Sequence, residues 1–106
     1  MIKFPNNPPP TPAKKAPITK AIILCYPNNP TGITMPRKDL EAVAEVLKKH
    51  EIWVITDEIY SELIYDEEHT SIASLPGMKE RCIYLNGFSK AFAMTGWRIG
   101  YVCAPR

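Results

Sequence analysis

The sequence contains no long apolar run, no dense set of cysteines and no large excess of either charge. Polar or turn residues interrupt every apolar stretch, so none can span a bilayer, and the N-terminus lacks the apolar centre of a signal peptide. The net charge is +2, and the lysines and arginines are spread along the chain, which disfavours nucleic acid and acidic membranes as partners. These absences favour an ordinary globular protein of the cytoplasm.

Metal and disulfide frameworks are also disfavoured by the few residues that could build them. The chain has three cysteines, Cys25, Cys82 and Cys103, each inside or beside an apolar run. An odd count at wide spacing does not favour a disulfide framework or a zinc site, so we expect reduced, buried thiols. The two histidines, His50 and His69, show no metal-binding spacing.

The N-terminal segment differs in composition from the rest of the chain. Residues 1–17 contain six of the eleven prolines. Proline removes a backbone donor and favours extended geometry, so this segment is predicted to be a disordered lead. Residues 18–106 have the composition of a globular domain, and this length can bury only one modest core.

Short apolar runs alternate with helical patterns in the globular part. Four runs predict strands, at residues 21–26, 52–56, 82–85 and 99–103. The first is nearly continuous and is typical of a strand buried on both faces of a parallel sheet. Pro36 can open a helix whose apolar face would consist of Leu40, Val43, Ala44 and Leu47. Single helical turns are expected at residues 60–65 and 72–75.

This alternation predicts an α/β fold with a mainly parallel sheet. Residues 85–99 are too few and too irregular for a crossover helix, so the last strand is predicted to run antiparallel to its neighbour. Polar clusters follow the first three strands, at residues 28–32, 57–60 and 86–90. The carboxyl ends of parallel strands meet at one sheet edge, so these clusters should surround one pocket, and Arg98 should join them.

The segments PNNPTG, DEIY and GFSKAFAMTGWRIGY, in this order, resemble class I and II aminotransferases. The resemblance covers residues 18–106 and implies part of the large domain of the aspartate aminotransferase-like fold. It also implies pyridoxal 5'-phosphate (PLP) as cofactor and transfer of an amino group between an L-amino acid and a 2-oxo acid. Members of this family usually work as homodimers.

The resemblance assigns a catalytic role to Lys90, the residue expected to form the Schiff base with PLP. Its amine must lose a proton before it can attack an aldehyde, and it can then move a proton at the substrate α-carbon. The resemblance also implies that Asp57 pairs with the pyridine nitrogen, where a carboxylate favours the protonated ring.

The resemblance assigns the remaining cofactor contacts to four residues. Asn29 and Tyr60 are expected to hydrogen-bond the 3'-oxygen of the cofactor. Arg98 is expected to bind the phosphate with its planar guanidinium, and Ser89 to add a hydroxyl to the same phosphate.

Structural roles compete with these assignments. Lys90 could be a surface lysine, Asp57 or Ser89 a helix cap, and Asn29 a turn residue. Tyr60 could be a packing residue. Gly87 stands where many relatives have serine or threonine, and the family's glycine-containing phosphate loop, ring-stacking aromatic residue and C-terminal carboxylate-binding arginine have no counterpart here.

Three outcomes therefore remain open. The first is transamination, and the second is another PLP reaction such as β-elimination or aminocyclopropane carboxylate synthesis. The third is a non-catalytic truncated fragment that at most binds PLP.

Overall fold

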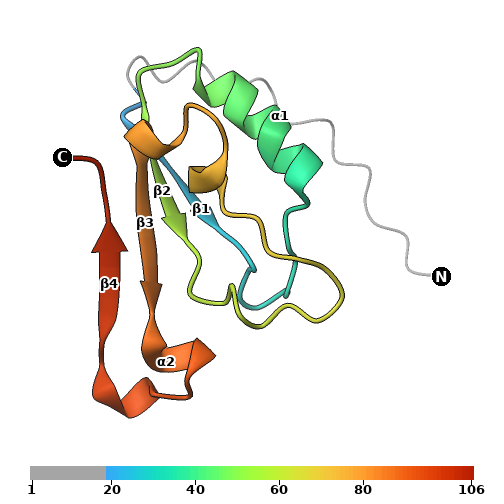
Figure 1. The fold of residues 1–106 in the computed structure, drawn as a ribbon, viewed down its shortest axis with the longest axis vertical. Coiled ribbons are helices and arrows are strands. Elements are labelled where there is room, and N and C mark those ends of the chain that lie inside the picture. Colours follow the sequence, from blue (N-terminus) through green and yellow to red (C-terminus); the bar gives the residue numbers. More distant parts are fainter. Residues whose placement is uncertain (1–18) are drawn as a thin grey trace, which may run out of the picture.

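The computed structural model describes residues 19–106, and the predicted lead over residues 1–17 lies outside this range. The described part is an α/β structure built on one sheet (Figure 1). Its strands are β1 (Ala21–Cys25), β2 (Trp53–Asp57), β3 (Cys82–Gly87) and β4 (Gly100–Cys103). Its helices are α1 (Arg37–Leu47) and the short α2 (Phe88–Ala91), with 3-10 turns η1 (Ile72–Ser74), η2 (Lys79–Arg81) and η3 (Thr95–Trp97).

The sheet has the order β1-β2-β3-β4. The first three strands are parallel, and β4 runs antiparallel to β3, so the mixed sheet is confirmed. Only α2 and η3 separate β3 from β4. This connection is too short to carry the chain back to the end of the sheet where β3 begins, as a parallel strand would require.

Helix α1 forms where the apolar spacing predicts it. Leu40, Ala44 and Leu47 are buried along one stripe. Pro36 precedes the first helical residue, where its missing N–H is harmless. At the other end, Arg81 Nη1 donates to Leu47 O and to His50 O, both at 2.8 Å, and so ties the end of α1 to the start of β3.

The core lies on one face of the sheet. It joins the stripe of α1 to side chains from the loop before β3 and from the strands themselves. The buried apolar residues are Tyr26, Leu40, Ala44, Leu47, Val54, Ile72, Leu75, Met78 and Cys82. Helix α1 and the turn η1 both pack on this face of the sheet, which we call the covered face.

The opposite face of the sheet, which we call the open face, is apolar and uncovered by any helix of residues 19–106. Strand register aligns Ile23 with Ile55 and Ile55 with Ile83 across it. Ile23 is 70% exposed, Trp53 48% and Val102 61%. The expectation that residues 21–26 are buried on both faces is therefore wrong for the described structure, because only the covered face carries a helical layer.

Two expectations about local structure also fail. Cys82 is buried, but Cys25 and Cys103 are exposed because they lie on the two edge strands. Residues 59–62 form hydrogen-bonded turns, and no helix is present over residues 60–65. The Asp57 side chain accepts from Ile59 N at 3.2 Å, a local bond that competes with helix formation. The turn expected at residues 72–75 is confirmed as η1, with Ser71 Oγ accepting from Ala73 N.

Replacement of Leu40 by Ala tests this one-sided core. Leu40 is fully buried between α1 and the sheet, so we expect a loss of about 2–5 kcal/mol in the free energy of unfolding. Val46→Ala is the matched control, because Val46 lies on the same helix and is 56% exposed, and it should change stability by less than about 0.5 kcal/mol. Urea denaturation followed by circular dichroism measures both. Equal losses for the two variants would contradict the assignment of the core face.

Candidate functional site

The three polar clusters lie at one edge of the sheet. Register aligns Cys25 with Asp57 and Asp57 with Leu85, so the carboxyl ends of β1, β2 and β3 are level. Gly87 pairs with Gly100, which brings the start of β4 to this edge as well. In Figure 1 these ends, α2 and the start of β4 all lie at the bottom of the sheet. The clusters therefore share one edge of the sheet, whereas a single pocket surrounded by all three, with Arg98 beside it, stays a prediction.

Three of the predicted site residues come together from separate parts of the chain. Asn29 Nδ2 donates to Tyr60 Oη at 3.2 Å. Lys90 Nζ lies 5.4 Å from the centroid of the Tyr60 ring, within the range of a cation–π interaction. An amide, a phenol and a primary amine therefore form one contiguous group.

The loop after β1 is shaped by its own hydrogen bonds. Asn28 O accepts from Gly32 N at 2.7 Å, and Thr31 Oγ1 donates to Asn28 Oδ1 at 2.9 Å. Gly32 has φ +70°, which glycine adopts without strain. This loop and the segment after β2 enclose a hollow of about 220 Å³. The hollow is lined by Pro27, Asn28, Asn29, Pro30, Gly32, Tyr60 and Leu63.

Asp57 ends β2 with a half-buried side chain on the open face. Cys25 is exposed as a residue, but partial desolvation raises the pKa of its thiol, and the negative charge of the neighbouring Asp57 raises this pKa further. The backbone N–H of Asn29 acts in the opposite direction. The pKa of Cys25 therefore depends on the charge of Asp57 at the edge where the polar clusters lie.

The segment from β3 to β4 holds the other predicted residues. Ser89 and Lys90 lie in α2. Arg98 adopts a left-handed backbone conformation, with φ 54°, and its Nη1 donates to Thr95 O at 2.9 Å. This bond directs the exposed guanidinium at the end of η3. Among the described residues, no side-chain hydrogen bond joins Arg98 or Ser89 to the Asn29–Tyr60–Lys90 group.

Backbone atoms of β4 and the residue before it pack closely against Gly87. A β-carbon there would lie 3.0 Å from Ile99 O and 3.1 Å from Gly100 Cα. Both contacts involve backbone, which cannot move aside as a flexible side chain could. Gly87 thus permits the close approach of β3 and β4 just before Ser89 and Lys90.

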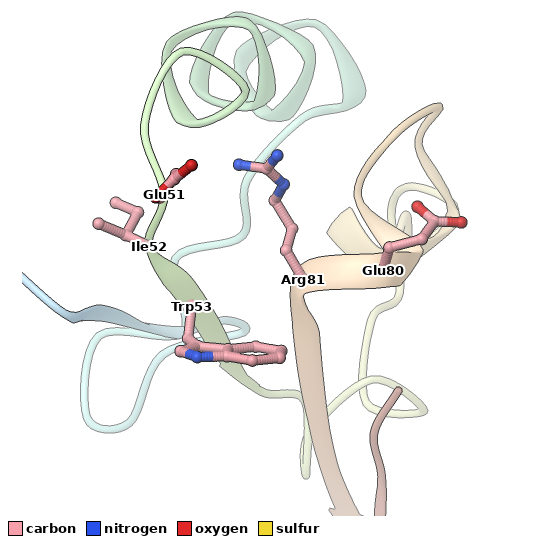
Figure 2. A pocket seen from close by; sticks show the side chains of 5 residues that line it. All are labelled: Glu51, Ile52, Trp53, Glu80 and Arg81. Carbon is pink, nitrogen blue, oxygen red and sulfur yellow. The ribbon is translucent and has the colours of Figure 1, made fainter. Parts of the chain in front are cut away.

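A second pocket lies at the opposite edge, away from these groups. It has a volume of about 240 Å³ and is lined by Glu51, Ile52, Trp53, Glu80 and Arg81. Figure 2 shows Arg81 extending towards the end of α1 and not across the strands. Its guanidinium is already bound to backbone carbonyls, so the pocket is a gap beside a helix cap.

Glu58 has partners that the sequence patterns do not predict. Strand alternation indicates that it points away from Asp57, but its partner His69 lies in a polar loop with no pattern that would pair them. His69 Nε2 lies 2.6 Å from Glu58 Oε2. Within residues 19–106, no group of three or more His, Cys, Asp or Glu side chains could hold a metal ion, and no helix is long and apolar enough to cross a membrane.

Comparison with known proteins defines the class. The model of the family "Aminotransferase class I and II" matches residues 11–106, so the chain belongs to this family. It is 57% identical over 88 residues to the aspartate aminotransferase of Pyrococcus abyssi, covering 82% of this chain and 23% of the relative. It is 53% identical over 89 residues to the arginine–pyruvate transaminase AruH of Pseudomonas aeruginosa, covering 84% of this chain and 23% of the relative.

Solved structures agree on the fold. The aromatic aminotransferase from Pyrococcus horikoshii OT3 aligns with a TM-score of 0.79 and 56% identity, over 82% of this chain and 24% of that chain. The described residues therefore form part of the aspartate aminotransferase-like fold. The chain spans less than a quarter of the length of each of these three proteins.

The Asp57 charge at the sheet edge can be tested through Cys25. In Asp57→Asn, the loss of the negative charge should lower the Cys25 pKa and increase its thiolate fraction, so iodoacetamide should modify Cys25 faster at pH 8. Peptide mass spectrometry measures the rate. Cys103 is the internal control, because it lies at the far end of β4, and its rate should not change. An unchanged Cys25 rate would contradict the proximity of the carboxylate.

Proposed function

We propose that this chain forms the cofactor-holding part of a PLP-dependent aminotransferase that moves an amino group between an L-amino acid and a 2-oxo acid. The observation that carries the proposal is the Asn29–Tyr60–Lys90 group at the edge where β1, β2 and β3 end. The names of the relatives described above refer to different amino acids, so the proposal covers the reaction type and not the side chain of the substrate.

The donor set at this edge fits PLP. The cofactor has an aldehyde, a pyridine nitrogen, a ring hydroxyl and a phosphate. The edge offers a primary amine for the aldehyde and a carboxylate for the nitrogen. It also offers an amide–phenol pair for the hydroxyl, and the Arg98 guanidinium and the Ser89 hydroxyl are the candidates for the phosphate. When bound, PLP accepts the electron pair released at the α-carbon of the amino acid.

Lys90 is proposed as the covalent attachment point and as the group that moves the proton. Its Nζ is exposed and lies over the Tyr60 ring, so the ring face defines one side of the space around the amine. With PLP bound, the free Nζ of Lys90 would lie beside the α-carbon of the amino acid, where it would remove the α-proton as a base and then donate it as an acid.

Asp57 is proposed to bind the pyridine nitrogen. A carboxylate can hold a proton on that nitrogen through a charge-assisted hydrogen bond, whereas an amide could only hydrogen-bond to it. The Asp57 side chain is already directed, because it accepts from Ile59 N at 3.2 Å. This bond limits the rotation of the carboxylate at the end of β2.

Asn29 and Tyr60 are proposed to share one oxygen ligand. Their mutual hydrogen bond of 3.2 Å places an amide N–H and a phenol O–H side by side. Both groups can donate to the ring oxygen of the cofactor, and together they fix the tilt of the ring. Arg98 and Ser89 are proposed to bind the phosphate, with the guanidinium engaging two oxygens at once.

Covalent binding of PLP to Lys90 tests the proposal directly. Incubation of the protein with PLP should give a visible absorption band, and borohydride should leave reduced PLP on the peptide that contains Lys90. Lys90→Ala should abolish the band and lower amino-group transfer by ~10²–10⁴-fold. Lys38→Ala is the control, because Lys38 is an exposed lysine on α1 and should leave both unchanged.

The possible outcomes separate the candidate functions. Transfer of ¹⁵N from an amino acid to a 2-oxo acid supports the proposal. A Lys90 adduct without transfer indicates the binding-only alternative, and pyruvate or a cyclic product indicates another PLP reaction. Absence of any adduct overturns the assignment of Lys90.

The phosphate contact predicts a loss of affinity in Arg98→Gln. A hydrogen bond to a charged group contributes about 1.5–3 kcal/mol, so the Kd for PLP should rise by ~10–100-fold. Arg37→Gln removes an arginine from an exposed pair with Glu41 and should leave the Kd unchanged. Titration of the absorption band measures both constants, and equal constants would contradict the role of Arg98.

A further inference from the structure

Glu58 is a fully buried carboxylate next to the proposed catalytic edge. Thr56 Oγ1 and Ser71 Oγ each donate to Oε1 at 2.8 Å, and Tyr26 Oη donates to the same oxygen at 3.4 Å. His69 Nε2 lies 2.6 Å from Oε2. We call Tyr26, Thr56, Glu58, His69 and Ser71 the Glu58 network.

Burying such a network lowers the stability of the fold unless every polar group in it has a hydrogen-bond partner. An uncompensated buried carboxylate is strongly unfavourable, and removing one partner leaves the others without hydrogen bonds. In the described residues no buried side-chain nitrogen or oxygen lacks a partner. The carboxyl group is thus held in one orientation by hydrogen bonds with four other side chains.

Tyr26 extends the network to the backbone. Its Oη accepts from Ile72 N at 2.9 Å while it donates to Glu58. Burial raises the pKa of Tyr26, and the Glu58 charge raises it further, so the phenol stays protonated and remains a donor. One hydroxyl therefore links β1, the carboxylate and the start of η1.

The network connects the segments that carry the proposed cofactor ligands. Glu58 lies between Asp57 and Tyr60, and Tyr26 directly precedes the loop that contains Asn29. The backbone supports the same connection, because Tyr26 N donates to Asp57 O at 3.3 Å and Glu58 N to Leu85 O at 3.0 Å. Movement of Glu58 would thus shift the β1 and β2 loops relative to one another.

We propose that Glu58 is a positioning residue: its buried carboxylate locks the loop after β1 to the loop after β2, and so holds Asn29 against Tyr60 and orients Asp57. Glu58 itself touches no reacting atom, since its side chain lies on the covered face. The link to catalysis rests on the proposed function, but the locking of the two loops is a property of the chain alone.

Amide hydrogen exchange without PLP tests the locking. In Glu58→Leu the donors of Tyr26, Thr56 and Ser71 lose their acceptor. Exchange should then increase about tenfold or more in residues 26–34 and in residues 57–63 together. Residues 37–47 of α1 should keep their protection. Glu58→Gln retains an acceptor oxygen of similar shape and should restore most of the protection in both loops.

Glu67→Gln is the matched control. Glu67 is exposed and accepts from Thr34 Oγ1, so it also connects the β1 loop to the segment after β2, but without burial. This variant should leave exchange in both loops unchanged. If Glu58→Leu does not fold, Thr56→Val and Ser71→Ala each remove one donor and should produce smaller, coupled increases in the same two loops.

A second measurement separates this inference from the proposed function. If the wild-type protein forms the Lys90 adduct, Glu58→Leu should shift its absorption maximum and raise the Kd for PLP, and Glu58→Gln should reverse most of both effects. Failure of the wild type to bind PLP counts against the proposed function, while hydrogen exchange still decides the role of Glu58. Uniform acceleration across the chain, or increases confined to residues 69–72, would overturn the inference.

Discussion

The parallel register of β1, β2 and β3 is the constraint on which the site depends. A shift of β2 by one residue against its neighbours would turn Asp57 to the covered face and move Tyr60 away from the loop that carries Asn29. Backbone pairing from Cys25 to Asp57 and Leu85 prevents such a shift over the last residues of the strands. The hydrogen bonds that build the sheet therefore also set the spacing of the proposed cofactor ligands.

The one-sided cover of this sheet has a direct consequence for the chemistry. Parallel sheets are normally covered on both faces, and here the apolar row Ile23, Ile55 and Ile83 is left on the open face together with Asp57. Water on that face weakens the charge-assisted bond expected between Asp57 and a pyridine nitrogen. A layer that covered the open face would exclude this water and strengthen the bond.

Sequence patterns were sufficient wherever the controlling interaction is local or periodic. The stripe of Leu40, Ala44 and Leu47 predicted α1, and the short link before β4 predicted an antiparallel pair. The polar clusters were found because each directly follows a strand. Patterns failed where the deciding contact is distant in sequence: Tyr26 meets Glu58 across 32 positions, and no local spacing signals this bond. The same holds for the open face, since a continuous apolar run does not reveal which elements cover it.

Two adjacent carboxylates at the end of β2 receive different environments from strand alternation alone. Successive side chains point to opposite faces, so Asp57 faces the open side with a charge available to a ligand, and Glu58 enters the covered side. A buried carboxyl group without hydrogen bonds would destabilise the fold, and the bonds of Glu58 with Thr56, Ser71 and His69 prevent this. Asp57 and Glu58 share one peptide bond. Fixing the buried carboxyl group of Glu58 therefore also restricts the backbone that carries the half-buried Asp57. The order Asp-Glu thus couples the rigidity of the covered face to the placement of the proposed cofactor ligand.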